Sequence, residues 1–247
     1  MKKTLILHIC GMAESLVDEK IKPTIDYLSN DDDIEFAILA HNYLIDVKVS
    51  VSGENELIID DTLKNINNEF VDVLGDNIYG YNEDTLEAVV QKMLSESKRT
   101  VSVAESCTGG MVASKLTNTP GSSMCFKESV VTYSNEAKIQ LLNVKKETLE
   151  QFGAVSEQTA NEMLNGILKL SKSEYAVSIT GIAGPDGGSA EKPVGLVYIG
   201  VSFNGNNEVN KCMFLGTRQD IRERATNVAL DSLRRLILKT RNKKVTK

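Results

Sequence analysis

Two patterns of apolar and polar positions, one typical of strands and one typical of helices, alternate along the first hundred residues. Runs of apolar, β-branched residues predict strands, and apolar positions three or four residues apart predict helices. Turn-forming residues agree with this division, because residues 29–33 (SNDDD) follow the first helical pattern. The predicted elements are strands at 3–9, 34–40, 44–51 and 77–80 and helices at 13–28, 55–73 and 83–97. Their β-α-β-β-α-β order is typical of a small α+β domain.

The rest of the chain alternates strands with longer helical patterns. Residues 204–207 (NGNN) predict a hairpin turn, and Ser156 and Thr159 are candidate caps of the helix that follows them. The predicted elements are strands at 100–104, 127–133, 175–180, 194–203 and 207–215 and helices at 108–117, 134–142, 146–152, 156–171 and 218–240. Strands covered by helices predict an α/β fold with three layers, α/β/α.

The balance of acidic and basic residues changes near residue 100, where the first group of predicted elements ends and the second begins. Residues 1–100 hold nine Lys and Arg against twenty Asp and Glu, whereas residues 101–247 hold nineteen against fourteen. We therefore expect a first domain at 1–97 and a second at 98–242, with Lys98-Arg99 at the boundary. An acidic first domain disfavours nucleic acid as a partner, and a mildly basic second one suits a small anionic ligand. The basic tail at 239–247 is expected to be disordered.

Cysteine usage and hydropathy exclude several classes of protein. The four cysteines, Cys10, Cys107, Cys125 and Cys212, show no C-x-x-C spacing, which disfavours a zinc site, a thioredoxin-like site and a secreted disulfide scaffold. The first residues lack the apolar length of a signal peptide, and no run approaches 18 apolar residues. We therefore expect a cytoplasmic protein that does not interact with membranes.

A loop with a candidate nucleophile follows the strand at 100–104. Residues 105–110 (ESCTGG) place Ser106 and Cys107 where α/β proteins carry catalytic side chains. Cysteine is intrinsically the better nucleophile, and a position before a helix lowers the pKa of its thiol. Local chemistry leaves both residues open as nucleophiles. It also leaves open an ordinary strand-to-helix turn in which Ser106 is the helix N-cap.

Histidine is missing from the second domain. The two histidines, His8 and His41, lie on predicted strands of the first domain, where a structural or surface role is expected. A Ser-His-Asp or Cys-His mechanism within the second domain is thus excluded by composition, and a serine nucleophile needs another base. Lys138 is the preferred base and Tyr133 a relay or orienting hydroxyl, since Tyr133 at the strand end and Lys138 one turn into the next helix can face the same crevice. The alternative is that Lys138 is a solvated surface lysine.

A second glycine-rich loop and an arginine cluster provide candidate binding groups. Residues 180–188 (TGIAGPDGG) follow a strand but lack the lysine of a Walker motif, which disfavours a nucleotide triphosphatase. Arg218, Arg222 and Arg224 open the last helix, where they suit a phosphate. A solvated helix face with Asp220 and Glu223 as partners explains the same arginines.

Taken together, the loops of the second domain resemble a known family. The matching segments are 104–110 (AESCTGG), 120–123 (PGSS), 131–138 (VTYSNEAK), 153–156 (GAVS), 180–188 (TGIAGPDGG) and 192–195 (KPVG). In this order they resemble the CinA C-terminal domain, the nicotinamide-nucleotide amidase family also called PncC. The resemblance implies hydrolysis of the carboxamide of nicotinamide mononucleotide to nicotinate mononucleotide and ammonia, in pyridine nucleotide salvage.

The resemblance also implies roles for individual residues. It makes Ser106 the nucleophile, with Lys138 and Tyr133 in proton transfer, and the amides near residues 108–110 candidates for an oxyanion hole. The residues that it implies for substrate binding are Glu105, Thr108, Gly109, Gly110, Asn135, Thr180, Gly181 and Gly184, with Arg218 or Arg222 on the 5′-phosphate. No metal and no cofactor are expected in this chemistry.

The first domain resembles the KH-like middle domain of full-length CinA. Residues 11–15 (GMAES) and 79–86 (YGYNEDTL) carry this weaker match. A G-x-x-G loop is missing and the domain is acidic, so a scaffold or dimerisation role in a homodimer or higher homo-oligomer is expected rather than RNA binding. The sequence holds no counterpart of the molybdopterin-binding-like domain of full-length CinA, so its ADP-ribose pyrophosphatase activity is not expected.

Two other functions remain as alternatives to the amidase. One is a non-catalytic nucleotide-binding or interaction protein, associated with competence or DNA damage as the family is. The other is a phosphatase or pyrophosphatase, which the lack of a dense acidic cluster in the second domain disfavours.

Overall fold

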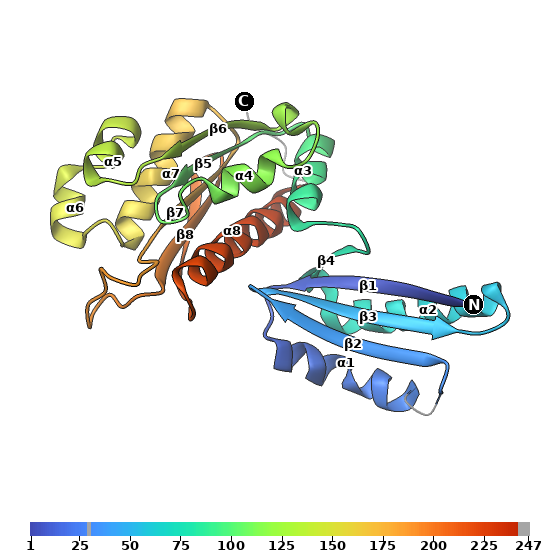
Figure 1. The fold of residues 1–247 in the computed structure, drawn as a ribbon. Helices are drawn as coiled ribbons and strands as arrows, with labels where there is room; N and C mark the ends of the chain where they lie inside the picture. The colour runs from blue at the N-terminus through green and yellow to red at the C-terminus, as the bar shows by residue number, and fades with distance from the viewer. Residues whose placement is uncertain (29–30, 242–247) are drawn as a thin grey trace. The chain divides into compact units, whose positions relative to one another are not determined.

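The chain forms two compact units. A computed structural model describes residues 1–28 and 31–241, and it separates Met1–Leu86 from a second unit that begins at Glu87 (Figure 1). Helix α3 (Leu86–Glu96), which we expected to close the first domain, therefore falls almost entirely in the second unit. Its side chains explain this, because Gln91 Nε2 donates to Pro120 O at 2.8 Å. The structure thus divides the chain at the start of this helix, whereas the boundary that we expected, after residue 97, lies just past its end.

The first unit has the predicted β-α-β-β-α-β order. Its elements are β1 (Lys2–Cys10), α1 (Glu14–Leu28), β2 (Ile34–His41), β3 (Leu44–Ser52), α2 (Glu56–Leu74), the short 3-10 helix η1 (Gly75–Asn77) and β4 (Ile78–Tyr81). The strands form one antiparallel sheet in the order β2-β3-β1-β4. Val47, Val49 and Val51 alternate along β3 and pack with Phe70 of α2 in the core. The α+β class expected for this part of the chain is confirmed.

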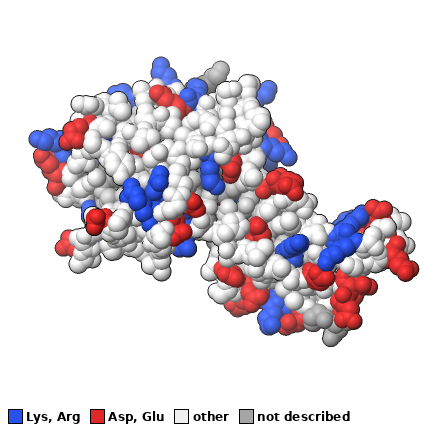
Figure 2. Space-filling model, viewed as in Figure 1, with Lys and Arg blue, Asp and Glu red and all other residues white. Residues whose placement is uncertain are grey.

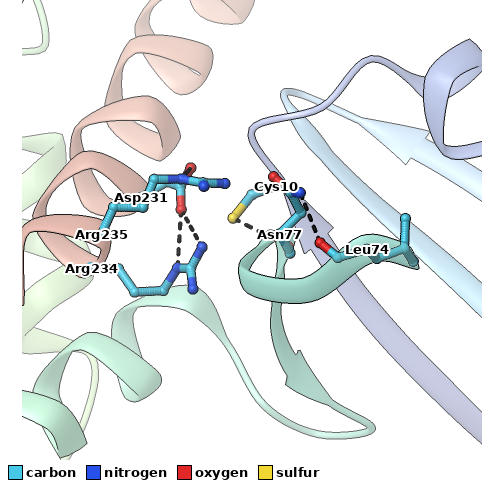
Figure 3. A network of polar contacts seen from close by, with 6 residues as sticks. All are labelled: Cys10, Leu74, Asn77, Asp231, Arg234 and Arg235. Carbon is cyan, nitrogen blue, oxygen red and sulfur yellow. Dashed lines mark hydrogen bonds and ion pairs between the residues drawn. The ribbon is translucent and has the colours of Figure 1, made fainter. Parts of the chain in front are cut away.

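Polar contacts within the first unit hold its turns. His8 Nδ1 lies 2.6 Å from Asp46 Oδ1 and its Nε2 lies 2.6 Å from Asn82 O, so His8 has the structural role that we expected. Asn77 Nδ2 donates to Leu74 O at 2.8 Å where α2 ends (Figure 3). Figure 2 shows many acidic side chains on the visible face of this unit, as its composition requires.

The second unit is a five-stranded sheet between two helical layers. After α3, its elements are β5 (Val101–Glu105), α4 (Met111–Thr117), the 3-10 helix η2 (Ser122–Met124), β6 (Phe126–Val131), α5 (Asn135–Leu142), α6 (Lys146–Phe152), α7 (Glu157–Ser171), β7 (Tyr175–Gly181), β8 (Leu196–Phe203), β9 (Asn206–Met213) and α8 (Arg218–Thr240). The strand order is β6-β5-β7-β8-β9; β5 is parallel to β6 and β7, and the remaining pairs are antiparallel.

Alternation along β7 shows how the layers are built. Ala176 packs with Met163 and Ile167 of α7, whereas the hydroxyl of Tyr175, one residue earlier, contacts Thr240 Oγ1 of α8 at 2.7 Å. Successive side chains of a strand point to opposite faces, so α7 and α8 cover opposite sides of the sheet. Helices α5 and α6 lie beside α7, and α4 lies beside α8 (Figure 1). The predicted three-layer α/β/α architecture is confirmed.

Local sequence explains the turns and ends of these elements. The β8–β9 turn is Asn204-Gly205, and both residues have positive φ, which Asn and Gly adopt at least cost. Ser156 is the N-cap of α7 and accepts from Thr159 N at 3.2 Å, as predicted. Within α8, Asp231 Oδ1 accepts from Arg234 Nη2 at 2.8 Å (Figure 3).

The C-terminal part of the chain differs from one expectation. Helix α8 continues through Thr240, so the start of the tail that we expected to be disordered is helical. Thr240 is 3% exposed and held by Tyr175, which explains why the helix continues to this residue. The remainder of that expectation, from residue 242 onward, lies outside the described residues. None of the described helices is both long and apolar enough to cross a membrane.

Candidate active site

Three loops meet at one edge of the second sheet. Because β5, β6 and β7 are parallel, their carboxyl ends lie on the same side, and the segments 106–110, 132–134 and 182–195 follow them there. Strand β5 lies between β6 and β7, so its loop is flanked by the other two. Such an edge is where open α/β sheets bind ligands. Both glycine-rich motifs of the sequence, far apart along the chain, therefore reach the same region.

Ser106 and Lys138 are in direct contact at this edge. Lys138 Nζ lies 3.1 Å from Ser106 Oγ, and it donates to Thr132 O at 2.8 Å. Helix α5 directs the lysine inward, because its N-cap Ser134 accepts from Ala137 N at 3.1 Å and fixes the first turn. Lys138 is 1% exposed and Ser106 is 8% exposed. The alternative of a solvated surface lysine is therefore wrong.

The surroundings of Lys138 favour its neutral form. Burial lowers the pKa of the Lys138 ammonium below its ordinary value, and the nearby Cys107 thiol opposes this shift. Among the described residues, no carboxylate forms an ion pair with Lys138. The Thr132 carbonyl can only accept, so one N–H of the amine points to it. The lone pair of a neutral amine is then left for the hydroxyl hydrogen of Ser106.

Glu105 fixes the loop that carries Ser106. Its buried carboxylate accepts from Gly110 N at 3.0 Å, Val112 N at 3.2 Å and Ala113 N at 3.0 Å, and so caps α4. Its backbone carbonyl accepts from Thr132 N at 2.8 Å, which joins the loop to the residue that holds Lys138. The N-cap position of α4 is Gly110, which has no side chain, so the idea that Ser106 caps this helix is wrong. Glu105 supplies the missing cap from the end of β5.

These contacts narrow the choice of amides for an oxyanion hole. Gly110 N donates to Glu105, and Gly109 N donates to Ser106 O at 3.1 Å, so both expected donors are already engaged. In the described part of the chain, Thr108 N donates to no backbone acceptor. The Thr108 hydroxyl is also buried and has no partner in the described part of the chain. Among the expected residues 108–110, Thr108 is therefore the one whose donors are uncommitted.

Cys107 is less suited to nucleophilic attack than its sequence position indicates. Its side chain is 6% exposed, and burial raises the pKa of the thiol to about 12. The thiolate is the reactive form, so very little of it exists near neutral pH. The structure therefore favours Ser106 over Cys107, a choice that local sequence chemistry left open.

The three arginines of α8 have different partners. Arg222 Nε donates to Cys107 O at 3.2 Å and Arg222 Nη2 to Thr108 O at 2.9 Å, which ties α8 to the Ser106 loop. Arg224 Nη1 donates to Leu215 O at 2.6 Å. Arg218 Nη1 donates to Gly184 O at 2.7 Å, and its Nη2 donates to the Tyr133 hydroxyl at 3.0 Å. Basic side chains gather over the N-terminal end of α8 in Figure 2.

Tyr133 and Lys138 point to different partners. Lys138 is buried against Ser106, whereas the Tyr133 side chain is 62% exposed and its hydroxyl contacts Arg218. Of the two residues expected to act in proton transfer, Lys138 therefore contacts Ser106 and Tyr133 contacts Arg218. Asn135, the first residue of α5, is exposed near Tyr133 in sequence, and it forms no hydrogen bond with Ser106 or Lys138 in the described part of the chain.

The second glycine-rich loop is held by contacts that the sequence did not reveal. Thr180 Oγ1 donates to Ala154 O at 2.7 Å, and Lys192 Nζ donates to Phe152 O at 2.5 Å and Val155 O at 2.8 Å. A side chain at Gly181 would lie 2.6 Å from Val197 Cγ2, which explains the glycine by close packing. No sequence pattern predicted the role of Lys192, since it depends on carbonyl groups that a sequence does not show.

Two families account for nearly the whole chain. Residues 83–237 match the family described as CinA C-terminal domain, and residues 4–80 match the damage-inducible protein CinA KH domain. A CinA-like protein of Endomicrobium trichonymphae is 54% identical over 240 residues, with 96% of this chain and 56% of the relative covered. A putative competence-damage inducible protein of Alkaliphilus metalliredigens is 44% identical over 234 residues, with 95% and 56% covered. The chain thus spans little more than half the length of these relatives.

Solved structures agree with the sequence matches. The competence/damage inducible protein CihA from Agrobacterium tumefaciens is 44% identical, with a TM-score of 0.58, and the alignment covers 61% of this chain and 94% of that one. A CinA superfamily protein from Klebsiella pneumoniae is 32% identical, with a TM-score of 0.60 and coverage of 63% and 99%. With its motifs, its fold and both domain matches in agreement, this chain belongs to the CinA family.

Proposed function

We propose that the second unit is an amidase that converts nicotinamide mononucleotide to nicotinate mononucleotide and ammonia. The observation that supports it most is the contact of Ser106 Oγ with the buried Lys138 Nζ at 3.1 Å. A hydroxyl beside a desolvated amine is one of the few ways to activate serine without histidine. The family resemblance supports the choice of substrate, and the geometry supports Ser106 as nucleophile and Lys138 as base.

The first half of the reaction transfers the acyl group to the enzyme. Ser106 Oγ forms a bond to the carboxamide carbon while its proton moves to Lys138 Nζ. The carbonyl oxygen becomes an oxyanion, for which Thr108 N–H and the Thr108 hydroxyl are the uncommitted donors among the expected residues 108–110. The C–N bond then breaks, and the leaving nitrogen takes the proton from Lys138 and departs as ammonia. Lys138 is thereby returned to its neutral form.

The second half releases the acid. A water molecule gives its proton to Lys138 Nζ and its oxygen attacks the ester carbon. The new tetrahedral species collapses with cleavage of the bond to Ser106 Oγ, which recovers its proton from Lys138. The products are the pyridine carboxylate and free enzyme, and the sum of both halves is amide plus water to acid plus ammonia. The Thr132 carbonyl at 2.8 Å keeps the amine in place through both halves.

The experiment that tests this function measures ammonia release by the purified 247-residue chain with nicotinamide mononucleotide. We expect turnover by the natural protein and none above background for Ser106→Ala. Ser114→Ala removes an exposed hydroxyl from α4, close in sequence but outside the contacts above, and is expected to keep the natural rate. Absence of ammonia release by the natural protein overturns the amidase and leaves a non-catalytic nucleotide-binding or interaction protein as the better description.

A further inference from the structure

Arg218 bridges the two loops that flank the Ser106 loop. Its Nη1 donates to Gly184 O at 2.7 Å in the segment after β7, and its Nη2 donates to the Tyr133 hydroxyl at 3.0 Å after β6. Both partners are neutral oxygen atoms. Among the described residues, Arg218 has no carboxylate partner, so its charge is not compensated by an ion pair. A neutral phenol is therefore all that competes with an anion for Arg218 Nη2.

The other groups at the start of α8 are less suited to an anion. The Arg222 guanidinium donates hydrogen bonds to the carbonyl oxygens of Cys107 and Thr108, and Arg224 donates to Leu215 O. At the start of the helix, the Asp220 carboxylate accepts from the N-cap amide, Thr217 N, at 2.8 Å in a capping box. That carboxylate repels a second anion placed at the helix N-terminus. Arg222 thus holds the Ser106 loop, whereas an anion on Arg218 Nη2 displaces only the Tyr133 hydroxyl.

Tyr133 is the group that such an anion would displace. Its side chain is 62% exposed. Among residues 1–28 and 31–241, its hydroxyl forms a hydrogen bond with Arg218 only. Tyr133 directly follows Thr132, whose carbonyl holds Lys138 Nζ at 2.8 Å. A rotation of its side chain therefore moves the hydroxyl without moving the backbone that positions Lys138. A phosphate group adds the attraction of opposite charges and can accept two parallel N–H bonds from the guanidinium, which a neutral phenol cannot, and this favours the exchange.

We propose that Arg218 couples occupancy by a phosphate group to the release of Tyr133, which then turns toward Ser106 and Lys138 and assists proton transfer. This inference rests on the proposed amidase function and adds a specificity device to it. The phosphate of the substrate then contributes to the rate of the chemical step as well as to binding. When a ligand has the carboxamide but lacks the phosphate, Arg218 still holds the Tyr133 hydroxyl, so Tyr133 does not assist proton transfer.

A kinetic experiment with the phosphate supplied separately tests the coupling. The whole chain is given nicotinamide riboside, which lacks the phosphate, with and without inorganic phosphite, and ammonia is measured at saturating riboside. We expect phosphite to raise kcat about tenfold, the size of an ordinary allosteric coupling. Arg218→Gln and Tyr133→Phe are expected to lose this increase. Arg241→Gln, which removes an exposed arginine at the other end of α8, is expected to keep it.

A second measurement follows Tyr133 without any turnover. The protein contains seven tyrosines, so 3-fluorotyrosine labelling gives few ¹⁹F resonances, and Tyr133→Phe identifies the relevant one by its loss. We expect phosphite to shift that resonance in the natural protein and in Arg241→Gln, and to leave it unchanged in Arg218→Gln.

The two measurements separate this inference from the proposed function. If nicotinamide mononucleotide is hydrolysed but phosphite changes only the KM for the riboside, the coupling is wrong and the amidase stands. If nothing is hydrolysed, the amidase is wrong, and the ¹⁹F shift still decides whether Arg218 releases Tyr133. An unchanged Tyr133 resonance at saturating phosphite overturns the inference in either case.

Discussion

Lys138 Nζ lies 3.1 Å from Ser106 Oγ, although the two residues are 32 positions apart in the sequence. The contact brings the start of α5 against the loop after β5, and it is closed by the bonds of Thr132 to Lys138 and Glu105. Backbone groups at the ends of β5 and β6 thus hold both members of the pair. A site built on such elements is positioned more accurately than one built on free loops.

The choice between Ser106 and Cys107 leads to the first prediction. Ser106→Ala is expected to lower kcat for nicotinamide mononucleotide by at least about 1000-fold, as the loss of a nucleophile does in other hydrolases. Cys107→Ala is expected to retain activity within about tenfold, because burial raises the pKa of its thiol to about 12. Ammonia release measures both variants. The reverse order of activities would make Cys107 the nucleophile.

The state of Lys138 leads to a pH dependence. The base must be neutral, so kcat/KM is expected to rise with pH through the lowered pKa of Lys138, with a midpoint below 10.5. Lys138→Arg keeps a charge that does not dissociate, and it is expected to be inactive at every pH. A value of kcat/KM that falls as pH increases from about 6 to about 9 would contradict the assignment. This range includes the ordinary pKa values of histidine, about 6.5, and of cysteine, about 8.5.

The same pKa shift predicts how stability depends on pH. A lysine whose pKa is lower in the folded state binds fewer protons there than in the unfolded chain at any pH between the two pKa values. The free energy of unfolding is therefore expected to rise with pH in that window, below 10.5, and to fall as pH decreases toward the folded-state pKa. Lys138→Met is expected to lose this contribution. Urea unfolding of both proteins across this window measures the difference.

Glu105 is expected to stabilise the second unit through its cap of α4. Glu105→Gln replaces an acceptor of three amide hydrogens with a group that is half donor, and we expect a loss of about 2 to 4 kcal/mol in the free energy of unfolding. Glu147→Gln is a matched control, since Glu147 is exposed in the first turn of α6, and a change under about 0.5 kcal/mol is expected there. If urea unfolding gives the same loss for Glu105→Gln and Glu147→Gln, the cap of α4 does not contribute to the stability of the second unit.

Close packing of α5 on α7 leads to a prediction that joins stability to activity. A Cβ at Gly166 would lie within van der Waals overlap of Leu142 O, in the helix that carries Lys138. Gly166→Ala is therefore expected to cost more than about 2 kcal/mol and to lower kcat by displacing α5. Gly53→Ala, where the nearest atom would be Ile59 Cγ1 at 3.6 Å, is the control and is expected to be tolerated. A Gly166→Ala protein with natural stability would show that α5 moves freely.

The fold was largely predictable from the sequence because it depends on short-range patterns. A run of apolar, β-branched residues predicted the strand at 44–51, which is β3, and residues 204–207 (NGNN) predicted the hairpin turn between β8 and β9. Such signals fix the local backbone and the side of an element that is buried. The boundaries were less accurate, as at α4, which begins at Met111 rather than near residue 108 because Glu105 provides its cap from outside the helix.

The sequence by itself determined which chemistry was available, and the tertiary structure decided which groups take part. The absence of histidine from the second domain excluded a histidine base within it, because composition does not depend on folding. Burial and long-range contacts then decided the rest: they put Lys138 on Ser106, raised the pKa of Cys107 and placed Tyr133 on Arg218. Desolvation and hydrogen bonding arise only when distant segments pack together, so no local pattern records them.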